Sequence, residues 1–221
     1  MSPAAGSPNY NSRDGVAVDM LVLHYTGMKS CQDALDRLCD PKAEVSAHYL
    51  IDEDGTAYQL VDEAERAWHA GVASWRGQDN INSRSIGIEL VNPGHEFGYR
   101  PFTPAQYDVL IPLCRDIVAR HAIPARNVVG HSDVAPARKT DPGELFDWQR
   151  LARESVGLWP DWLADPCDAA KAPDLLGEIG YDVSDEAAAI TAFQRHFAPH
   201  RLDGVADAET RRALAALHTL I

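Results

Sequence analysis

The chain has 221 residues, 45% of them hydrophobic and 24% charged, which is enough for one sizeable core or for a main domain with a small appendix. Its formal net charge of −13 argues against nucleic acid or an anionic membrane as a partner. No stretch approaches the roughly 18 consecutive apolar residues of a membrane-spanning helix, so we expect no membrane insertion.

Residues 1–15 are rich in Pro, Gly, Ser and Asn and are predicted to form an irregular lead-in. They contain neither the basic start nor the apolar core of a signal peptide. This pattern indicates a cytoplasmic protein, or a periplasmic one if the sequence has been trimmed.

A continuous apolar run over residues 20–25 is typical of a strand buried on both faces, and His24 lies near its end. On this segment alone, a core histidine and a ligand are equally good interpretations of His24. Residues 29–39 are predicted to form a short amphipathic helix. Cys31 and Cys39 lie roughly 12 Å apart along that helix, too far for a disulfide, so we expect reduced thiols.

Two β-rich runs over residues 45–51 and 56–61 are joined by Asp52-Glu-Asp-Gly55, a turn signal that predicts a hairpin. His48 lies in its first strand and is interpreted as structural. Residues 63–68 are predicted to form a polar turn. The following Trp68-His69-Ala70-Gly71 could line a cleft, although a tryptophan more often packs in a core or at its rim.

Glu89 is out of place in the next predicted strand, residues 85–91, which follows a loop over residues 75–84. Its neighbours are Ile86, Ile88 and Leu90, and an unpaired carboxylate in an apolar strand is costly. A partner such as a cation or several N–H donors is therefore favoured. The alternative is an edge strand with Glu89 in solvent.

After a predicted loop over residues 93–101, Thr103-Pro104 begins a long helix that ends near residue 121. The stretch from Val128 to Asp141 is then a short β-branched run that ends at Gly130-His131 and crosses a loop to Lys139-Thr-Asp141. A histidine, a lysine and a carboxylate delivered where a buried strand ends indicate a functional loop. Residues 145–152 are predicted to form a short helix.

From residue 165 onward the composition shifts to Ala, Leu and Asp, with helices predicted over residues 174–180, 185–197 and 206–217. So short a segment makes a marginal core by itself, so we expect it to pack against the main domain. The predicted organisation is a domain of residues 1–164 followed by a helical module of residues 165–221.

Strands alternating with helices in the first 160 or so residues predict an α/β domain with a central mixed β-sheet flanked by helices, followed by the small three-helix module. His24, Glu89 and His131 each lie on or at the end of a predicted strand, and strand ends at one edge of a sheet can converge. With Asp141, the two histidines supply two imidazoles and a carboxylate, and three protein ligands with an open fourth position are the pattern of catalytic zinc. Glu89 would then be an acid or base beside the metal.

Five blocks stand in a recognisable order: residues 21–26 (LVLHYT), 46–51 (SAHYLI), 67–71 (AWHAG), 85–90 (SIGIEL) and 130–143 (GHSDVAPARKTDPG). Together they resemble the zinc-dependent N-acetylmuramoyl-L-alanine amidases of the type 2 amidase family, and most closely the AmpD and AmiD branch. The family's fold is shared with phage T7 lysozyme and peptidoglycan recognition proteins. The later pattern Asp203-Gly204-x-x-Asp207-x-x-Thr210 resembles helical peptidoglycan-binding modules.

The resemblance implies Zn²⁺ as cofactor, with His24, His131 and Asp141 as its ligands. It implies Glu89 as the catalytic acid and base, and Lys139 as a cation that stabilises the oxyanion of the tetrahedral intermediate. In an extended segment the side chains of Lys139 and Asp141 point the same way, which agrees with that role.

Two positions depart from relatives in the family. Ala47 stands where T7 lysozyme-like members carry a tyrosine, so more of the catalytic work falls on Glu89. Asn80 matches an arginine that holds the anhydro-sugar in AmpD-type enzymes, which argues against a strict preference for 1,6-anhydromuramyl substrates. Trp68, Trp75 and Asn80 are the candidate substrate contacts, and His69 is interpreted as a cleft-wall or packing residue.

The expected function is hydrolysis of the amide between the muramoyl lactyl group and L-alanine, in muropeptides or peptidoglycan, during cell-wall recycling. One alternative is an exported autolysin that acts on polymeric peptidoglycan. Another is a non-catalytic peptidoglycan-recognition module. Such modules typically lack a zinc ligand or the acid, whereas this chain has all of them.

Overall fold

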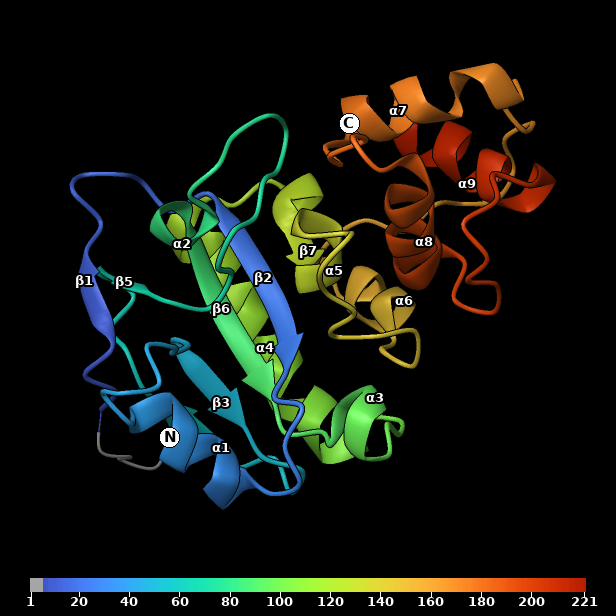
Figure 1. The fold of residues 1–221 in the computed structure, drawn as a ribbon. Helices are drawn as coiled ribbons and strands as arrows, with labels where there is room; N and C mark the ends of the chain where they lie inside the picture. Colours follow the sequence, from blue (N-terminus) through green and yellow to red (C-terminus); the bar gives the residue numbers. More distant parts are fainter. Residues whose placement is uncertain (1–5) are drawn as a thin grey trace.

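The structure, a computed structural model, describes residues 6–221, so the first five residues of the predicted lead-in lie outside the described part. Its centre is a five-stranded sheet in the order β4-β3-β6-β2-β7 (Figure 1). Strand β4 is antiparallel to β3 and the other neighbours are parallel, which confirms the predicted mixed sheet. The strands are β2 (Met20–Tyr25), β3 (Tyr49–Ile51), β4 (Ala57–Gln59), β6 (Ser85–Leu90) and β7 (Val128–Gly130).

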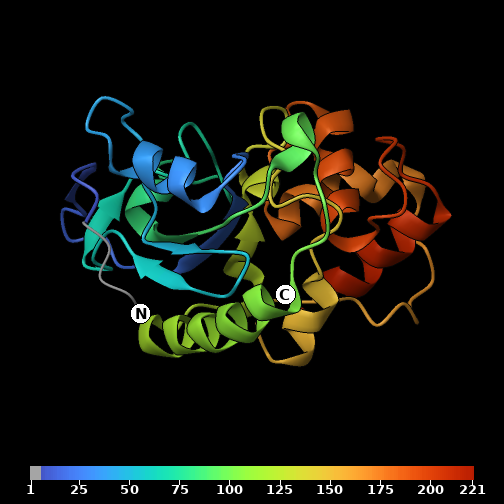
Figure 2. The same ribbon diagram turned by 90° about the horizontal axis from the view of Figure 1, so that it is seen from below.

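Helix α4 (Pro104–His121) covers one face of the sheet (Figure 2). Thr103 begins it with a capping box, because its side chain accepts from the backbone of Gln106 while the Gln106 side chain accepts from the backbone of Thr103. The side chains of Leu21 and Leu23 on β2 point into this layer, since alternate residues of a strand face opposite sides. The helix and its start are as predicted.

The opposite face of the sheet is covered in two places. Helix α1 (Cys31–Cys39) packs Ala34 and Leu38 against Leu50 of β3. The helices of residues 165–221, called the C-terminal module below, pack near β2 and β7, where Met20 and Val22 belong to their core. His24 and Glu89 lie on this same face, because they alternate with the residues that contact α4.

Five short elements occur where the sequence predicts loops or turns. The prediction of an irregular lead-in is wrong at β1 (Tyr10–Ser12), which pairs with β5 (Glu65–Ala67) in a region predicted to be a turn. The remaining three are α2 (Ile81–Arg84), α3 (Gly94–Phe97) and α5 (His131–Val134). Elements of three or four residues are too short to show a periodic pattern in the sequence. Contacts with distant segments determine whether they form.

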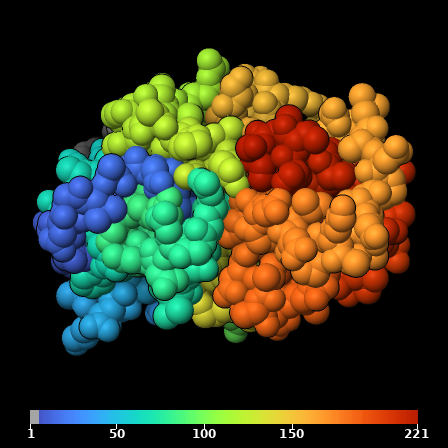
Figure 3. Space-filling model, turned by 90° about the horizontal axis from the view of Figure 1, so that it is seen from above, coloured from blue at the N-terminus to red at the C-terminus, as the bar shows by residue number. Residues whose placement is uncertain are grey.

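The C-terminal module contains α7 (Ala172–Ile179), α8 (Glu186–Phe197) and α9 (Ala208–His218), the three predicted helices, with a 3₁₀ turn η2 (Ala169–Lys171) before them. It packs side by side with the rest of the chain (Figure 3), as expected. The remaining elements are η1 (Ala125–Asn127) and α6 (Trp148–Arg153).

The Asp203-to-Thr210 pattern has a local structural role. Asp203 accepts hydrogen bonds from the backbone N–H of Val205 and from the Gln194 side chain, which shapes the loop. Asp207 is the N-cap of α9 and accepts from the backbone N–H of Thr210. These residues therefore build the entry to a helix.

All four cysteines lie within residues 6–221, and no disulfide joins any two of them. Across the same residues, no helix combines the length and the apolar character needed to cross a membrane.

Candidate metal centre

The register of three parallel strands brings the predicted site residues together at one edge of the sheet. His24 on β2 is directly opposite Glu89 on β6, and Leu23 is opposite Gly130 on β7. His131 is the next residue after Gly130, so its backbone lies next to that of His24. Carboxyl ends of neighbouring parallel strands meet at such an edge, which is a common place for a functional site.

His24, His131 and Asp141 converge through three atoms. The His24 Nδ1 atom lies 3.0 Å from His131 Nδ1 and 2.9 Å from Asp141 Oδ2, and His131 Nδ1 lies 3.0 Å from that same oxygen. All three residues are buried, and they are the one group with metal-ligand geometry within residues 6–221. Tetrahedral zinc ligands lie roughly 3.3 Å from one another, so these spacings are close to what zinc requires.

The tautomer of His131 is set by a backbone carbonyl. Its Nε2 atom lies 2.9 Å from the oxygen of Ala70, and because a carbonyl can only accept, Nε2 carries the hydrogen. The neutral ring then has a lone pair on Nδ1, the atom that faces the other two ligands.

The tautomer of His24 is set by a longer chain of hydrogen bonds. Ser85 donates its hydroxyl hydrogen to the oxygen of Ile81 at 2.6 Å, so Ser85 Oγ must accept from His69 Nε2 at 3.1 Å. The neutral His69 ring therefore accepts at Nδ1, and His24 Nε2 donates to it at 3.0 Å. This leaves a lone pair on His24 Nδ1 as well. Outer hydrogen bonds of this kind orient histidine ligands in metal sites.

The protonation states of these three side chains show whether the site can accept a cation. Burial, and then the charge of His131, lower the pKa of His24 to about 4, so its ring is neutral at neutral pH. Burial alone would raise the pKa of Asp141, but the contacts with His131 and His24 outweigh it and hold the pKa below its usual value. Two lone pairs and a carboxylate oxygen thus face one another with no hydrogen between them, and such a set is stabilised by a bound cation.

Glu89 lies in a central strand, between β3 and β2, so the edge-strand alternative is wrong. Its Oε2 atom is shielded from solvent and has no hydrogen-bond partner among residues 6–221. Burial, and then the charge of Asp141, raise the pKa of Glu89 to about 8, while Lys139 opposes that rise. An acid with a pKa near neutrality is suited to exchange protons with a reacting group.

A cleft of about 400 Å³ opens above this centre. Glu89, His131, Lys139 and Asp141 line it, and α1 contributes Arg37 to the lining. Lys139 is close enough to Glu89 and His24 for its charge to lower the pKa of both. A chain with a net charge of −13 therefore has a cleft lined by the cationic side chains of Arg37, Arg138 and Lys139.

The three candidate substrate contacts lie in different places. Trp68 lines the cleft, half-buried, with its indole N–H donating to Asn11. Trp75 is absent from the cleft lining and only 2% exposed, because it packs edge-on against Tyr181 at 5.2 Å between ring centres. Asn80 is exposed before α2 and accepts from Arg66, outside the cleft lining. The structure thus brings Trp68 alone of the three to the cleft above the candidate metal centre.

Sequence reasoning gave His69 a cleft-wall or packing role, which is confirmed because His69 is buried and lines the cleft, and it gave no role to Ser85, Arg37 or Arg138. His69 and Ser85 orient His24, and the two arginines line the cleft. A position beside Trp68 in a recognisable block was the one available signal for His69. Its hydrogen-bond partner on β6, Ser85, can be identified only in the folded chain.

Comparison with known proteins gives consistent matches. Residues 14–144 match the family model described as N-acetylmuramoyl-L-alanine amidase. Over 229 aligned residues the chain is 43% identical to the N-acetylmuramoyl-L-alanine amidase AmiD of Escherichia coli, covering 90% of this chain and 82% of AmiD. It is also 38% identical over 163 residues to the 1,6-anhydro-N-acetylmuramyl-L-alanine amidase AmpD of Escherichia coli, covering 66% of this chain and 87% of AmpD.

Solved structures agree with these sequence matches. The complex of Escherichia coli AmiD with anhydro-N-acetylmuramic acid-L-Ala-D-γ-Glu-L-Lys superposes with a TM-score of 0.84 at 40% identity, covering 97% of this chain and 92% of that one. AmpDh3 from Pseudomonas aeruginosa superposes with a TM-score of 0.84 at 32% identity, covering 98% and 96%. Both matches include the C-terminal module.

Proposed function

The chain belongs to the N-acetylmuramoyl-L-alanine amidase family of hydrolases, and we propose that it uses Zn²⁺ to hydrolyse the amide between the muramoyl lactyl group and L-alanine. The observation that carries the metal proposal is the convergence of two imidazole lone pairs and a carboxylate at 2.9–3.0 Å. Their donor set, with an open side facing the cleft, is typical of catalytic zinc.

Glu89 and Lys139 supply the acid–base and electrostatic parts of the reaction. A bound Zn²⁺ would supply Lewis acidity toward the scissile carbonyl and a positive charge that favours the ionised form of Glu89. In that form Glu89 takes a proton from the attacking water and delivers it to the leaving nitrogen of L-alanine. Lys139, at the mouth of the same centre, faces the oxyanion that develops on the carbonyl oxygen.

Anhydro-muropeptides are the proposed substrates, in cell-wall recycling. AmiD is solved with an anhydromuramyl tripeptide, and AmpDh3 with an anhydromuramic pentapeptide. The cationic side chains that line the cleft favour binding of such peptides, because the peptides carry anionic carboxylates. Polymeric peptidoglycan is the alternative substrate, which the likeness of the C-terminal module to wall-binding modules favours. A cytoplasmic place of action stays a prediction, testable by fractionation of the source cells.

Paired assays test the reaction. Zinc-loaded protein is incubated with an anhydromuramyl tripeptide or with intact peptidoglycan, and mass spectrometry identifies the products. We expect a free peptide that begins with L-alanine, and we expect a chelator to abolish its formation. Failure to release that peptide from either substrate would remove the amidase proposal.

Glu89→Gln tests the assignment of the acid and base. The substitution keeps the size of the side chain and removes its ability to take a proton, so turnover should fall by about 10²- to 10⁴-fold. Zinc content, measured by metal analysis, should stay close to one ion per chain because Glu89 is not a ligand. Near-normal turnover in this variant would exclude Glu89 from the mechanism.

A further inference from the structure

A buried carboxylate joins the C-terminal module to the loop that carries a metal ligand. Asp133 lies in the first turn of α5 and is 1% exposed. It accepts a hydrogen bond from the backbone N–H of Gly130 at 2.7 Å. Its two other hydrogen bonds come from the module: Tyr181 donates its hydroxyl at 2.7 Å, and His196 donates from Nδ1 at 2.7 Å.

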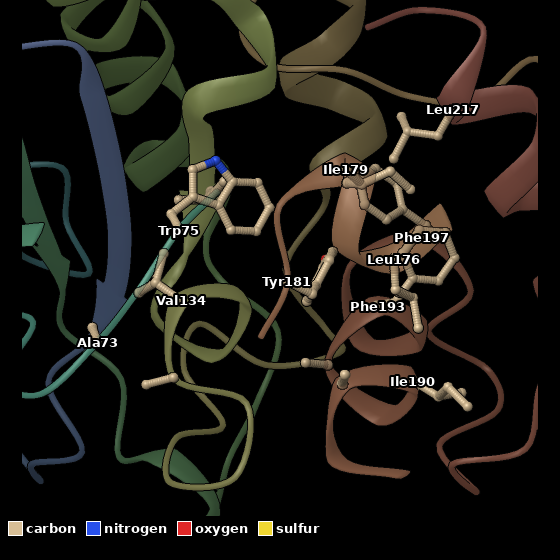
Figure 4. Close-up of a cluster of buried hydrophobic side chains, with 14 of the residues drawn as sticks. Ala73, Trp75, Val134, Leu176, Ile179, Tyr181, Ile190, Phe193, Phe197 and Leu217 are labelled. Carbon is tan, nitrogen blue, oxygen red and sulfur yellow. The ribbon is translucent and has the colours of Figure 1, made fainter. Parts of the chain in front are cut away.

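The two donors are themselves held in place by packing. The His196 ring stacks on Trp148 of α6 with 3.8 Å between ring centres. Tyr181 lies between Trp75 on one side and Phe193 on the other (Figure 4). Burial, and then the charge of Asp133, raise the pKa of Tyr181 well above its usual value, so the phenol stays neutral and donates. Neither donor can turn away without disturbing these contacts.

The first turn of α5 in turn places two of the three metal ligands. His131 is its first residue, directly after Gly130, whose N–H is fixed by Asp133. The backbone N–H of Ser132 donates to the backbone carbonyl oxygen of Asp141 at 2.9 Å. A shift of this turn would therefore move His131 and Asp141 relative to His24, which is held independently on β2.

We propose that Tyr181 and His196 are positioning residues of the metal centre, which act through Asp133 to hold His131 and Asp141 at ligand distance. The C-terminal module is then part of the metal site, whether or not it also binds cell wall. The inference rests on the metal-binding part of the proposed function and does not depend on the reaction or the substrate.

Two substitutions remove the donors one at a time. Tyr181→Phe removes a single hydroxyl, and His196→Ala removes the imidazole. His196→Asn is the rescue variant, because its side-chain N–H₂ can donate from nearly the position of Nδ1. Leu214→Ala is the matched control, since it weakens apolar packing on α9 of the same module, whereas Tyr181 and His196 lie before α9. All are made in the full-length chain.

The measurement is the dissociation constant for Zn²⁺, with the visible absorption of bound Co²⁺ as a second reporter of ligand geometry. Tyr181→Phe and His196→Ala should each raise the Zn²⁺ dissociation constant by about tenfold, the lower end of the range for outer contacts of metal ligands. The Co²⁺ spectrum should change in both and recover in His196→Asn. Leu214→Ala should lower the melting temperature yet leave the dissociation constant and the spectrum unchanged.

Two results overturn the proposal. One is an unchanged dissociation constant and spectrum in folded Tyr181→Phe. This result is sufficient to reject the proposal even if His196→Ala fails to fold. The other is an equal loss of affinity in Leu214→Ala, which would make the effect a general consequence of a weakened module. Loss or retention of amidase activity does not enter either criterion, so failure of the proposed reaction remains distinguishable.

Discussion

Glu89 makes the stability of the metal-free chain depend on pH. Its pKa is about 8 in the folded chain and about 4.5 when exposed, so the folded state binds a proton that the unfolded state releases between these values. Its contribution to stability is complete below about pH 4.5 and is lost as the pH rises through 8. The part of the free energy of unfolding that depends on Glu89 should therefore fall between pH 5 and pH 8.

Glu89→Gln isolates this contribution. Glutamine is neutral at every pH, so the variant should gain stability over the parent as the pH rises, by as much as about 4 kcal/mol at pH 8 and by little at pH 5. Urea unfolding of both chains in the presence of a chelator measures the difference. A difference that does not change with pH would show that Glu89 is already ionised in the folded, metal-free chain.

At the level of single residues, the sequence was most informative where chemistry conflicts with a local pattern. Glu89 could be singled out because a carboxylate is costly in an apolar strand, and Asp141 because it follows a histidine and a lysine at the end of another. The role of His69 could not be predicted, because its acceptor and donor come from Ser85 and His24, on two strands distant in sequence. Trp75 could be interpreted as a substrate contact because nothing local shows that another segment buries it.

Among the elements, strand β6 has a feature that supports the metal centre directly. Its Gly87 lies under the His69 ring, and a Cβ atom at this position would come within 2.4 Å of that ring. Because Ser85, Gly87 and Glu89 face the same side of the strand, the missing side chain leaves room for the hydrogen-bond chain that orients His24.

Gly87→Ala should therefore displace His69. We expect a loss of about 3 kcal/mol in the free energy of unfolding from overpacking, and a 10- to 100-fold weaker affinity for Zn²⁺ as the contact with His24 is lost. Urea unfolding of the metal-free chain and Zn²⁺ titration measure the two effects. Gly177→Ala on α7 is the control, since a Cβ there meets nothing within 4 Å and should leave Zn²⁺ affinity unchanged. Normal Zn²⁺ affinity in Gly87→Ala would show that His69 does not contribute to Zn²⁺ binding.

Element length decided how well the sequence predicted secondary structure. Strand β2, helix α4 and the three module helices were predicted close to their bounds, because six or more residues show a recognisable apolar run or helical pattern and Thr103 marks the start of α4. Strands β1 and β5 have three residues each and form because they pair with each other across the chain. Helix α5 has four residues, and its first turn depends on Asp133.

On the scale of the whole molecule, one apolar core crosses the proposed boundary near residue 164. Its members from before the boundary include Met20, Val22, Trp75 and Val129, and those from the module include Phe193. The sequence could predict that three short helices need a partner, but not that the partner surface would be the face of the sheet that carries the metal centre. We therefore expect the two parts to unfold together.

Phe193→Ala tests this cooperativity. Phe193 is fully buried in the shared core, so the substitution should cost about 3–5 kcal/mol and lower the melting temperature on the order of 10 °C. Far-ultraviolet ellipticity reports the whole chain, and the visible absorption of bound Co²⁺ reports the metal centre. Both transitions should shift together, because loss of the module removes two hydrogen bonds from Asp133 and exposes the sheet. Val205→Ala, at a position that is 56% exposed in the module, should shift neither. Two separate transitions, with that of the metal centre unmoved by Phe193→Ala, would mean that residues 1–164 fold independently.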